Sequence, residues 1–272
     1  MTKRLLVVDW DYFFPMVETT YDTPNSPRGD WEWQLYDWGH SETMTYFQQD
    51  AWPPRAAAFL RNDLPLPGTS GEELTFWKRF QFAKGAQVYV ADSNSQAAHA
   101  MVAEGINAVY LYDAHHDSGY RPTAQQDVAE RQQVSCEDWM LAYYGWGVRK
   151  LVTRYPRWRK VAFECEPEPA IPIDRQFDDG SPVPVTFHRV FICRSGAWTP
   201  PWLDPKFHQF VDACPAGTAR QFDGMTARPW SDDMAVEAAR QRAEIDALLR
   251  QQLDQPGVRD AAVKVLGEIE LQ

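Results

Sequence analysis

The sequence has 272 residues, of which 44% are hydrophobic and 24% are charged, and its formal net charge is −11. This composition is typical of a globular protein. The length fits one large α/β domain, so we predict a single domain over residues 1–272. The acidic balance argues against a protein that binds nucleic-acid backbones, because such binding needs clustered Lys and Arg.

Cysteine spacing and hydropathy indicate the cellular compartment. The four cysteines are too far apart for a C-x-x-C metal site or a dense disulfide framework. Only four apolar residues lie between Arg4 and Asp9, which is too short a run for a signal peptide. No stretch approaches the ~18 apolar residues of a membrane span. We therefore expect a cytoplasmic protein with reduced thiols and no membrane contact.

The chain begins with a predicted strand followed by a long aromatic segment. Residues 4–8 form an apolar, β-branched run, which is typical of a strand buried on both faces of a parallel sheet. From Tyr12 to about Gly71 the sequence is rich in Trp, Tyr, Pro, Asp and Gly and has little periodicity. We predict a loop-rich aromatic insertion or lid over residues 16–75.

A predicted βαβ unit comes next. It consists of a strand over 87–91, a helix over 96–104 capped by Ser93 or Ser95, and a strand over 108–112. Short joints of this kind are typical of a right-handed crossover between parallel strands.

The rest of the chain continues the alternation of strands and helices. We predict a helix over 135–144, opened by Ser135, and a long surface helix over 231–253. Residues 166–184 are rich in Pro, Asp and Gly and are expected to cross the surface. This alternation predicts an α/β fold with a mostly parallel sheet. Further predicted strands cover 148–153, 160–165 and 189–193.

Two acidic motifs follow predicted strands. The motif Asp113-Ala114-His115-His116-Asp117 follows the strand over 108–112, and Asp9-Trp10-Asp11 follows the first strand. Ligands of open parallel sheets gather beyond the carboxyl ends of strands, so these side chains are expected to converge. Carboxylate oxygens beside one imidazole suit Mn²⁺ or Zn²⁺. Each motif alone also fits ordinary turn chemistry, but the two together favour a metal site.

The same residues carry a resemblance to a known family. Residues 109–117, with their D-A-H-x-D, resemble the metal-binding strand end of the arginase, agmatinase and histone-deacetylase (ureohydrolase) superfamily. Residues 7–14 resemble its D-x-D strand, and residues 88–94 and 137–147 resemble a poorly characterised arginase-like branch. The resemblance covers roughly residues 86–160 plus the first fifteen. It implies a three-layer α/β sandwich, with the D-x-D strand permuted to the N-terminus.

The resemblance also implies ligands for one or two ions of Mn²⁺ or Zn²⁺. Asp9 and Asp113 would be shared between the two ion positions. His115 and Asp11 would complete one position, and Asp117 would hold the other.

One position of the family pattern differs in this chain. The histidine of the family's acid-His pair falls at Ser93 or Asn94, which makes Asn94 the counterpart of a metal ligand. A single-ion site built from Asp113, His115 and Asp9 is the alternative to a two-ion site.

These motifs lead to a functional prediction. A metal-activated water attacks an amide or amidine carbon, so we predict a metal-dependent hydrolase that cleaves a C–N bond in a small polar guanidino, amidine or acylamino substrate. His116 is a candidate proton donor. Glu137 and Asp138, together with Tyr120, are candidates for orienting ligands or binding substrate.

Two other classes of function compete with this prediction. A non-catalytic, arginase-like binding module is suggested by Asn94 in place of a histidine and by the aromatic insertion. A metal-dependent phosphoesterase is the second alternative, since D-x-D and D-x-H also occur in dinuclear phosphatases.

Overall fold

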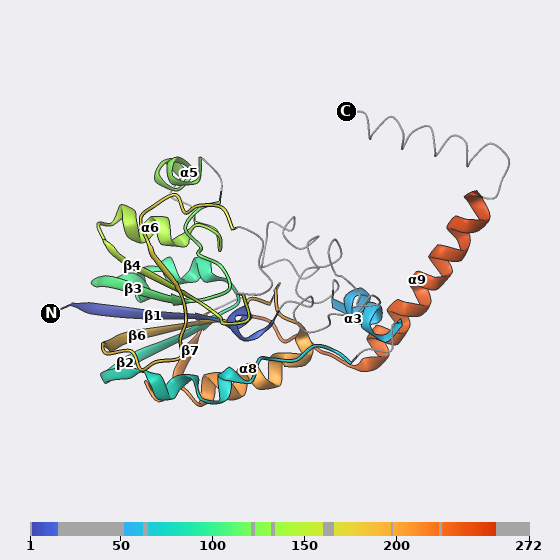
Figure 1. Ribbon diagram of the computed structural model, residues 1–272, viewed down its shortest axis with the longest axis horizontal. Helices are drawn as coiled ribbons and strands as arrows, with labels where there is room; N and C mark the ends of the chain where they lie inside the picture. The colour runs from blue at the N-terminus through green and yellow to red at the C-terminus, as the bar shows by residue number, and fades with distance from the viewer. Residues whose placement is uncertain are drawn as a thin grey trace.

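The computed structural model describes residues 2–15, 52–61, 65–120, 123–131, 134–159, 166–196, 198–222 and 225–253. The described strands form one sheet in the order β5-β4-β3-β1-β6-β2-β7, and every neighbouring pair is parallel (Figure 1). The predicted α/β fold with a parallel sheet is therefore confirmed. The strands are β1 (Lys3–Asp9), β2 (Gln81–Ala91), β3 (Ile106–Tyr112), β4 (Lys150–Tyr155), β5 (Asp174–Phe177), β6 (Thr186–Cys193) and β7 (Ala219–Gln221).

Strand β1 lies inside the sheet because its side chains are apolar on both faces. Leu5, Leu6, Val7 and Val8 are all fully buried. Strand β1 pairs with β3 on one side, where Val8 is the partner of Tyr112, and with β6 on the other side. The carboxyl ends of parallel strands lie at one edge of a sheet, so the loops that follow β1, β3 and β6 meet there.

Helices cover both faces of the sheet. Trp139 and Met140 of α6 pack with Leu5 and Val7 on one face, and α8 supplies apolar side chains to the core on the other face. Figure 1 shows α5 and α6 on one side of the sheet and α8 on the opposite side. The described α-helices are α3 (Trp52–Arg61), α4 (Ala100–Ala103), α5 (Ala124–Arg131), α6 (Trp139–Gly145), α8 (Asp204–Asp212) and α9 (Asp232–Leu253). The described 3-10 helices are η1 (Trp10–Phe13), η3 (Glu72–Leu74), η4 (Phe76–Arg79), η5 (Asn94–Ala98) and η6 (Pro201–Leu203).

The predicted βαβ unit differs from the structure in two ways. The helix expected over 96–104 is divided into η5 and α4, because His99 has an extended backbone and its Nδ1 accepts the Met101 N–H at 3.2 Å. Ser93 caps η5 as predicted, since its Oγ accepts the Ser95 N–H at 3.2 Å. Strands β2 and β3 are parallel but not neighbours, because β1 and β6 lie between them.

The helix predicted over 135–144 begins later, at Trp139. The Ser135 N–H donates to Asp138 Oδ1 at 2.6 Å, so the Asp138 side chain holds Ser135 and Ser135 does not cap the helix. The helix ends at Gly145 as expected, and Gly147 adopts the left-handed backbone with φ 89°.

Two segments predicted to be irregular contain regular structure. Helix α3 lies within the predicted insertion, because Pro53 and Pro54 fall in the first turn, where proline is tolerated, and alanines follow. Strand β5 lies within 166–184 and was missed because it is a short, polar edge strand without a hydrophobic pattern. Three predicted stretches lie outside the described residues: 16–51 and 62–64 of the insertion, and the strand over 160–165.

Helix α9 confirms the predicted helix over 231–253 almost to the residue. It packs against α3 and extends away from the sheet (Figure 1). No helix in the described part of the chain combines the length and the apolar composition that a membrane crossing needs.

Candidate metal centre

The loop after β1 turns immediately into η1, and this turn positions the D-x-D motif. Asp9 is the N-cap of η1, and its Oδ1 accepts the Asp11 N–H at 2.9 Å. Asp11 in turn reaches the loop after β3, where its Oδ1 accepts the Ala114 N–H at 3.2 Å. The two sequence motifs are therefore hydrogen-bonded to each other at the carboxyl edge of the sheet.

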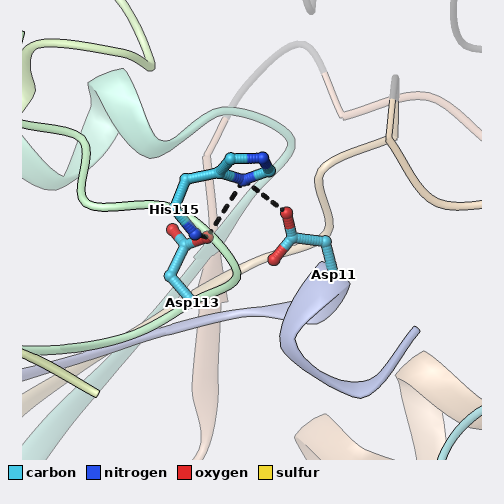
Figure 2. A group of neighbouring side chains, drawn as sticks. All are labelled: Asp11, Asp113 and His115. Carbon is cyan, nitrogen blue, oxygen red and sulfur yellow. Dashed lines mark hydrogen bonds and ion pairs between the residues drawn. The ribbon is translucent and has the colours of Figure 1, made fainter. Parts of the chain in front are cut away.

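Three side chains from these two loops converge on one point (Figure 2). His115 Nδ1 lies 3.0 Å from Asp11 Oδ2 and 3.5 Å from Asp113 Oδ1. One ligand atom from each of the three residues lies within 4.8 Å of the other two. Asp113 Oδ1 also accepts the His115 backbone N–H at 2.8 Å, which fixes the turn that presents the imidazole. This set of one nitrogen and two carboxylate oxygens is suitable for a divalent metal ion.

A second group of side chains lies beside the first and is centred on Asn94. Asn94 Nδ2 lies 2.7 Å from Asp9 Oδ2, 2.8 Å from Asp117 Oδ2 and 3.1 Å from Asp113 Oδ2, so its two hydrogens are shared among three oxygens. The two closer oxygens have another donor each. Ser195 Oγ donates to Asp9 Oδ2 at 2.6 Å, and Trp139 Nε1 donates to Asp117 Oδ2 at 2.7 Å.

The predicted ligands therefore lie together, although they come from three loops. The structure brings the six candidate residues into two adjoining groups that share Asp113. That they bind a metal stays a prediction. The six are Asp9, Asp11, Asn94, Asp113, His115 and Asp117.

The carboxylates are buried together, and this arrangement disturbs their protonation. Burial raises the pKa of Asp9 and of Asp113 well above its usual range, and the neighbouring Asp11 charge adds to both shifts. Burial also raises the pKa of Asp117, to about 7. In the described part of the chain, the ion pairs of these aspartates involve only His115. A buried group of this kind is short of positive charge, which a divalent cation would supply.

His115 and Asp11 behave differently because they form an ion pair. Burial acts to lower the pKa of His115, but the hydrogen bonds to Asp11 and Asp113 raise it well above the usual value. Burial acts to raise the pKa of Asp11, but the hydrogen bond and charge of His115 lower it. In the absence of a metal ion, the protonated imidazole therefore neutralises part of the negative charge.

Backbone strain is concentrated at the same place. Asp117 (φ 48°) and Ser195 (φ 49°) are the only non-glycine residues with positive φ among those that the structure describes. Such a conformation costs about 1–3 kcal/mol per residue and persists only where the surroundings impose it. Both residues contact the Asn94-centred group, so the strain serves to place their side chains there.

His116 is buried away from solvent and both of its ring nitrogens are occupied. Nε2 lies 2.9 Å from the Pro167 carbonyl oxygen, and Nδ1 accepts the Ser118 N–H at 3.1 Å. The ring stacks on Tyr120 with 4.3 Å between centroids. Burial lowers the pKa of His116, which keeps it neutral. This geometry assigns His116 to holding the loop; proton transfer by His116 stays a prediction that the geometry does not favour.

The other residues predicted to orient ligands or bind substrate have hydrogen-bond partners outside the two groups. Asp138 accepts the Ser135 N–H, as described above, and the Glu137 carbonyl accepts the Gly119 N–H at 2.9 Å. Tyr120 donates its hydroxyl hydrogen to Glu166 Oε1 at 2.6 Å. These hydrogen bonds do not involve a carboxylate of the two groups, and the catalytic roles of the three residues stay predictions.

Three residues of the site were not singled out from the sequence. Ser195 follows β6, so its position after a predicted buried strand was a usable signal. Trp139 lies in the segment that carried the family resemblance, although no role was assigned to its indole. Glu166 accepts the His116 N–H at 2.8 Å and pairs with Arg159 at 3.0 Å. No local pattern pointed to Glu166, since its neighbours are distant in the chain.

A buried ionic network supports the loop that carries Ser195. Arg194 Nη2 donates to Asp92 Oδ2 at 2.7 Å, and Arg194 Nη1 donates to Asp204 Oδ2 at 3.2 Å. Arg228 binds the same Asp204 through Nε at 3.0 Å. Arg228 also donates to the Thr199 carbonyl at 2.6 Å, and Arg194 and Thr199 are both held by this network.

Comparison with known proteins gives no match: no family model, no curated protein and no solved structure is significantly similar to this chain. Function must therefore be inferred from the site itself.

Proposed function

We propose that this protein is a metal-dependent hydrolase that cleaves a C–N bond in a small polar guanidino, amidine or acylamino substrate. The observation that carries the proposal is the convergence of Asp11, Asp113 and His115 at the carboxyl edge of a parallel sheet. The donor atoms fit Mn²⁺ or Zn²⁺, and in the described part of the chain His115 is the only cationic partner of the buried carboxylates.

The fold supports this proposal in general terms. A parallel sheet with helices on both faces is what an arginase-like or deacetylase-like three-layer sandwich requires. In such a fold the site depends on which strands are neighbours and not on their order in the chain. The adjacency of β1 and β3 is therefore compatible with a D-x-D strand permuted to the N-terminus.

A bound Mn²⁺ or Zn²⁺ ion supplies a water of lowered pKa and polarises the substrate. Asp11 and Asp113 orient the His115 imidazole. Because both carboxylates are buried, water does not compete with the imidazole for their oxygens. His115 is the most exposed of the three, with 34% of its side chain accessible, so substrate approaches from the His115 side. The Trp198 ring lies 5.8 Å from the His115 ring and provides an apolar wall beside this approach.

The proposal is tested by elemental analysis of protein purified without chelator. Wild type is expected to carry Mn or Zn, and Asp11→Asn and Asp113→Asn are expected to lose it. Asp174→Asn is the matched control, because Asp174 is a half-exposed aspartate paired with Arg154 on β4. Hydrolysis is then screened with guanidino and acylamino compounds, and with a generic phosphate ester for the phosphoesterase alternative.

Two results would overturn the proposal. One is a wild type that stays empty after Mn²⁺ and Zn²⁺ are added, which would favour the binding module. The other is a metal content that the Asp113→Asn substitution leaves unchanged.

A further inference from the structure

We propose that the centre holds one metal ion and that the Asn94 amide permanently occupies the place of a second ion. This inference rests on the proposed metal site at Asp11, Asp113 and His115. It assigns Asn94 a role opposite to that of a ligand: the amide is an uncharged hydrogen-bond donor that takes the place of a cation.

The first argument is the geometry around the amide nitrogen. Three carboxylate oxygens from three aspartates surround Asn94 Nδ2 at 2.7, 2.8 and 3.1 Å. A metal ion bound to those oxygens would lie about 2.0–2.2 Å from each of them. That position overlaps the nitrogen, so the amide and an ion exclude each other.

The Asn94 amide is oriented with its nitrogen, and not its oxygen, toward the three carboxylates. Asn94 is 2% exposed, and its Oδ1 is buried with no hydrogen-bond partner in the part of the chain that the structure describes. Leaving an acceptor unsatisfied costs free energy, so the contacts of Nδ2 must determine the orientation. The reverse orientation would withdraw the amide hydrogens from all three aspartates and place the amide oxygen against their oxygens.

Two other uncharged donors, besides the amide, bind the carboxylates around Asn94. Ser195 Oγ and Trp139 Nε1 each donate to an oxygen that also receives the amide. These two donors and the amide give Asp9 Oδ2 and Asp117 Oδ2 two uncharged donors each.

Asp113 shows how the two positions are divided. Its Oδ1 faces His115, at 2.8 Å from the backbone nitrogen and 3.5 Å from Nδ1, whereas its Oδ2 receives the Asn94 amide. The carboxylate that would bridge two ions therefore has one oxygen at the proposed ion position and the other on the amide. The two positions also differ in solvent exposure: the His115 side chain is 34% accessible, whereas Asn94 is buried.

The test is the number of ions per chain, measured on chelated protein reloaded with Mn²⁺ or Zn²⁺ alone. Mass spectrometry of the metal content gives the count, and titration calorimetry gives the affinity of each step. Wild type is expected to bind one ion. Asn94→Asp is isosteric and replaces the donating nitrogen with a fourth carboxylate oxygen, so it is expected to bind two.

Two further variants keep the test decisive. Asn107→Asp adds the same charge at an exposed residue whose side chain contacts Lys3, and it is expected to stay at one ion. Asn94→Ala removes the amide without adding charge; it is expected to admit a second, weaker ion and serves if Asn94→Asp does not fold.

The outcomes separate this inference from the proposed function. Two ions in wild type would overturn the inference and leave the metal site intact. One ion in wild type and in both Asn94 variants would also overturn it, because the position would then not accept a cation. No ion in wild type would overturn the proposed function together with the inference.

Discussion

Asp204 is the carboxylate on which two buried guanidinium groups depend. It accepts hydrogen bonds from Arg228 and from Arg194, whose side chains are 0% and 1% exposed. Asp204→Asn keeps the volume and removes the charge. In the described part of the chain, Arg194 would then keep the carboxylate of Asp92, and Arg228 would keep only backbone carbonyl oxygens as acceptors.

The expected loss of stability follows from this count of charges. Breaking a buried ion pair by neutralising one partner costs about 3–5 kcal/mol, because a charge stays buried without compensation. For an m-value of about 3 kcal/mol/M in urea, the upper end of the range for small proteins, the unfolding midpoint falls by about 1–1.7 M.

Urea unfolding followed by tryptophan fluorescence measures this shift. Arg240→Gln is the control, because Arg240 pairs with Glu237 and Glu244 on the exposed surface of α9 and should give no resolvable shift. A midpoint for Asp204→Asn that equals the midpoint of the control would refute the reasoning, since the network would then carry no net stabilisation.

Three further predictions concern the site. First, the metal-free protein should lose thermal stability as the pH rises from about 4 to 7. Asp117 has a pKa of about 7 in the folded protein, so the folded state keeps a proton that the unfolded chain has already released in this range. The raised pKa of His115 extends the loss of stability above about pH 6.5. Scanning fluorimetry with EDTA checks this, and the gain in Tm on adding Mn²⁺ should grow over the same range; a rising Tm with EDTA would contradict it. Second, Ser195→Ala should weaken metal binding about 10- to 100-fold by releasing Asp9, whose Oδ1 positions the proposed ligand Asp11; circular dichroism should be unchanged, and an unchanged affinity by calorimetry would disprove it. Third, His116→Ala should destabilise the protein by about 2–4 kcal/mol in urea, because it leaves the Pro167 carbonyl and the Ser118 N–H unpaired; normal stability combined with lost activity would instead assign His116 to catalysis.

The fold could be predicted from the sequence where buried elements require a recognisable pattern of apolar residues. Residues 4–8 read as a doubly buried strand and form β1, because apolar side chains are needed on both faces there. Strand β5 has no such requirement at the edge of the sheet, and its sequence gives no signal. Strand β7, with three residues, was missed for the same reason.

The order of the strands in the sheet could not be predicted, and this limited the account of the site. The two acidic motifs were found because each is local in sequence. Their convergence depends on β1 lying beside β3, which was only inferred. The donors around Asn94 come from the loop after β6 and from α6, so neither the contact of Ser195 with Asp9 nor the orientation of the amide could be predicted before the strands were placed.

The placement of β1 inside the sheet also determines when the protein can fold during its synthesis. Asp9 and its hydrogen-bond partner Ser195 are 186 residues apart. At about 5–20 residues per second, a ribosome needs about 10–40 s to reach the second residue after making the first. Throughout this interval β6 is not available to pair with β1, so the apolar side chains of β1 must be buried against something else. The centre therefore assembles only after β6 and Ser195 have been synthesised, so a chain truncated before β6 is expected to bind chaperones and no metal.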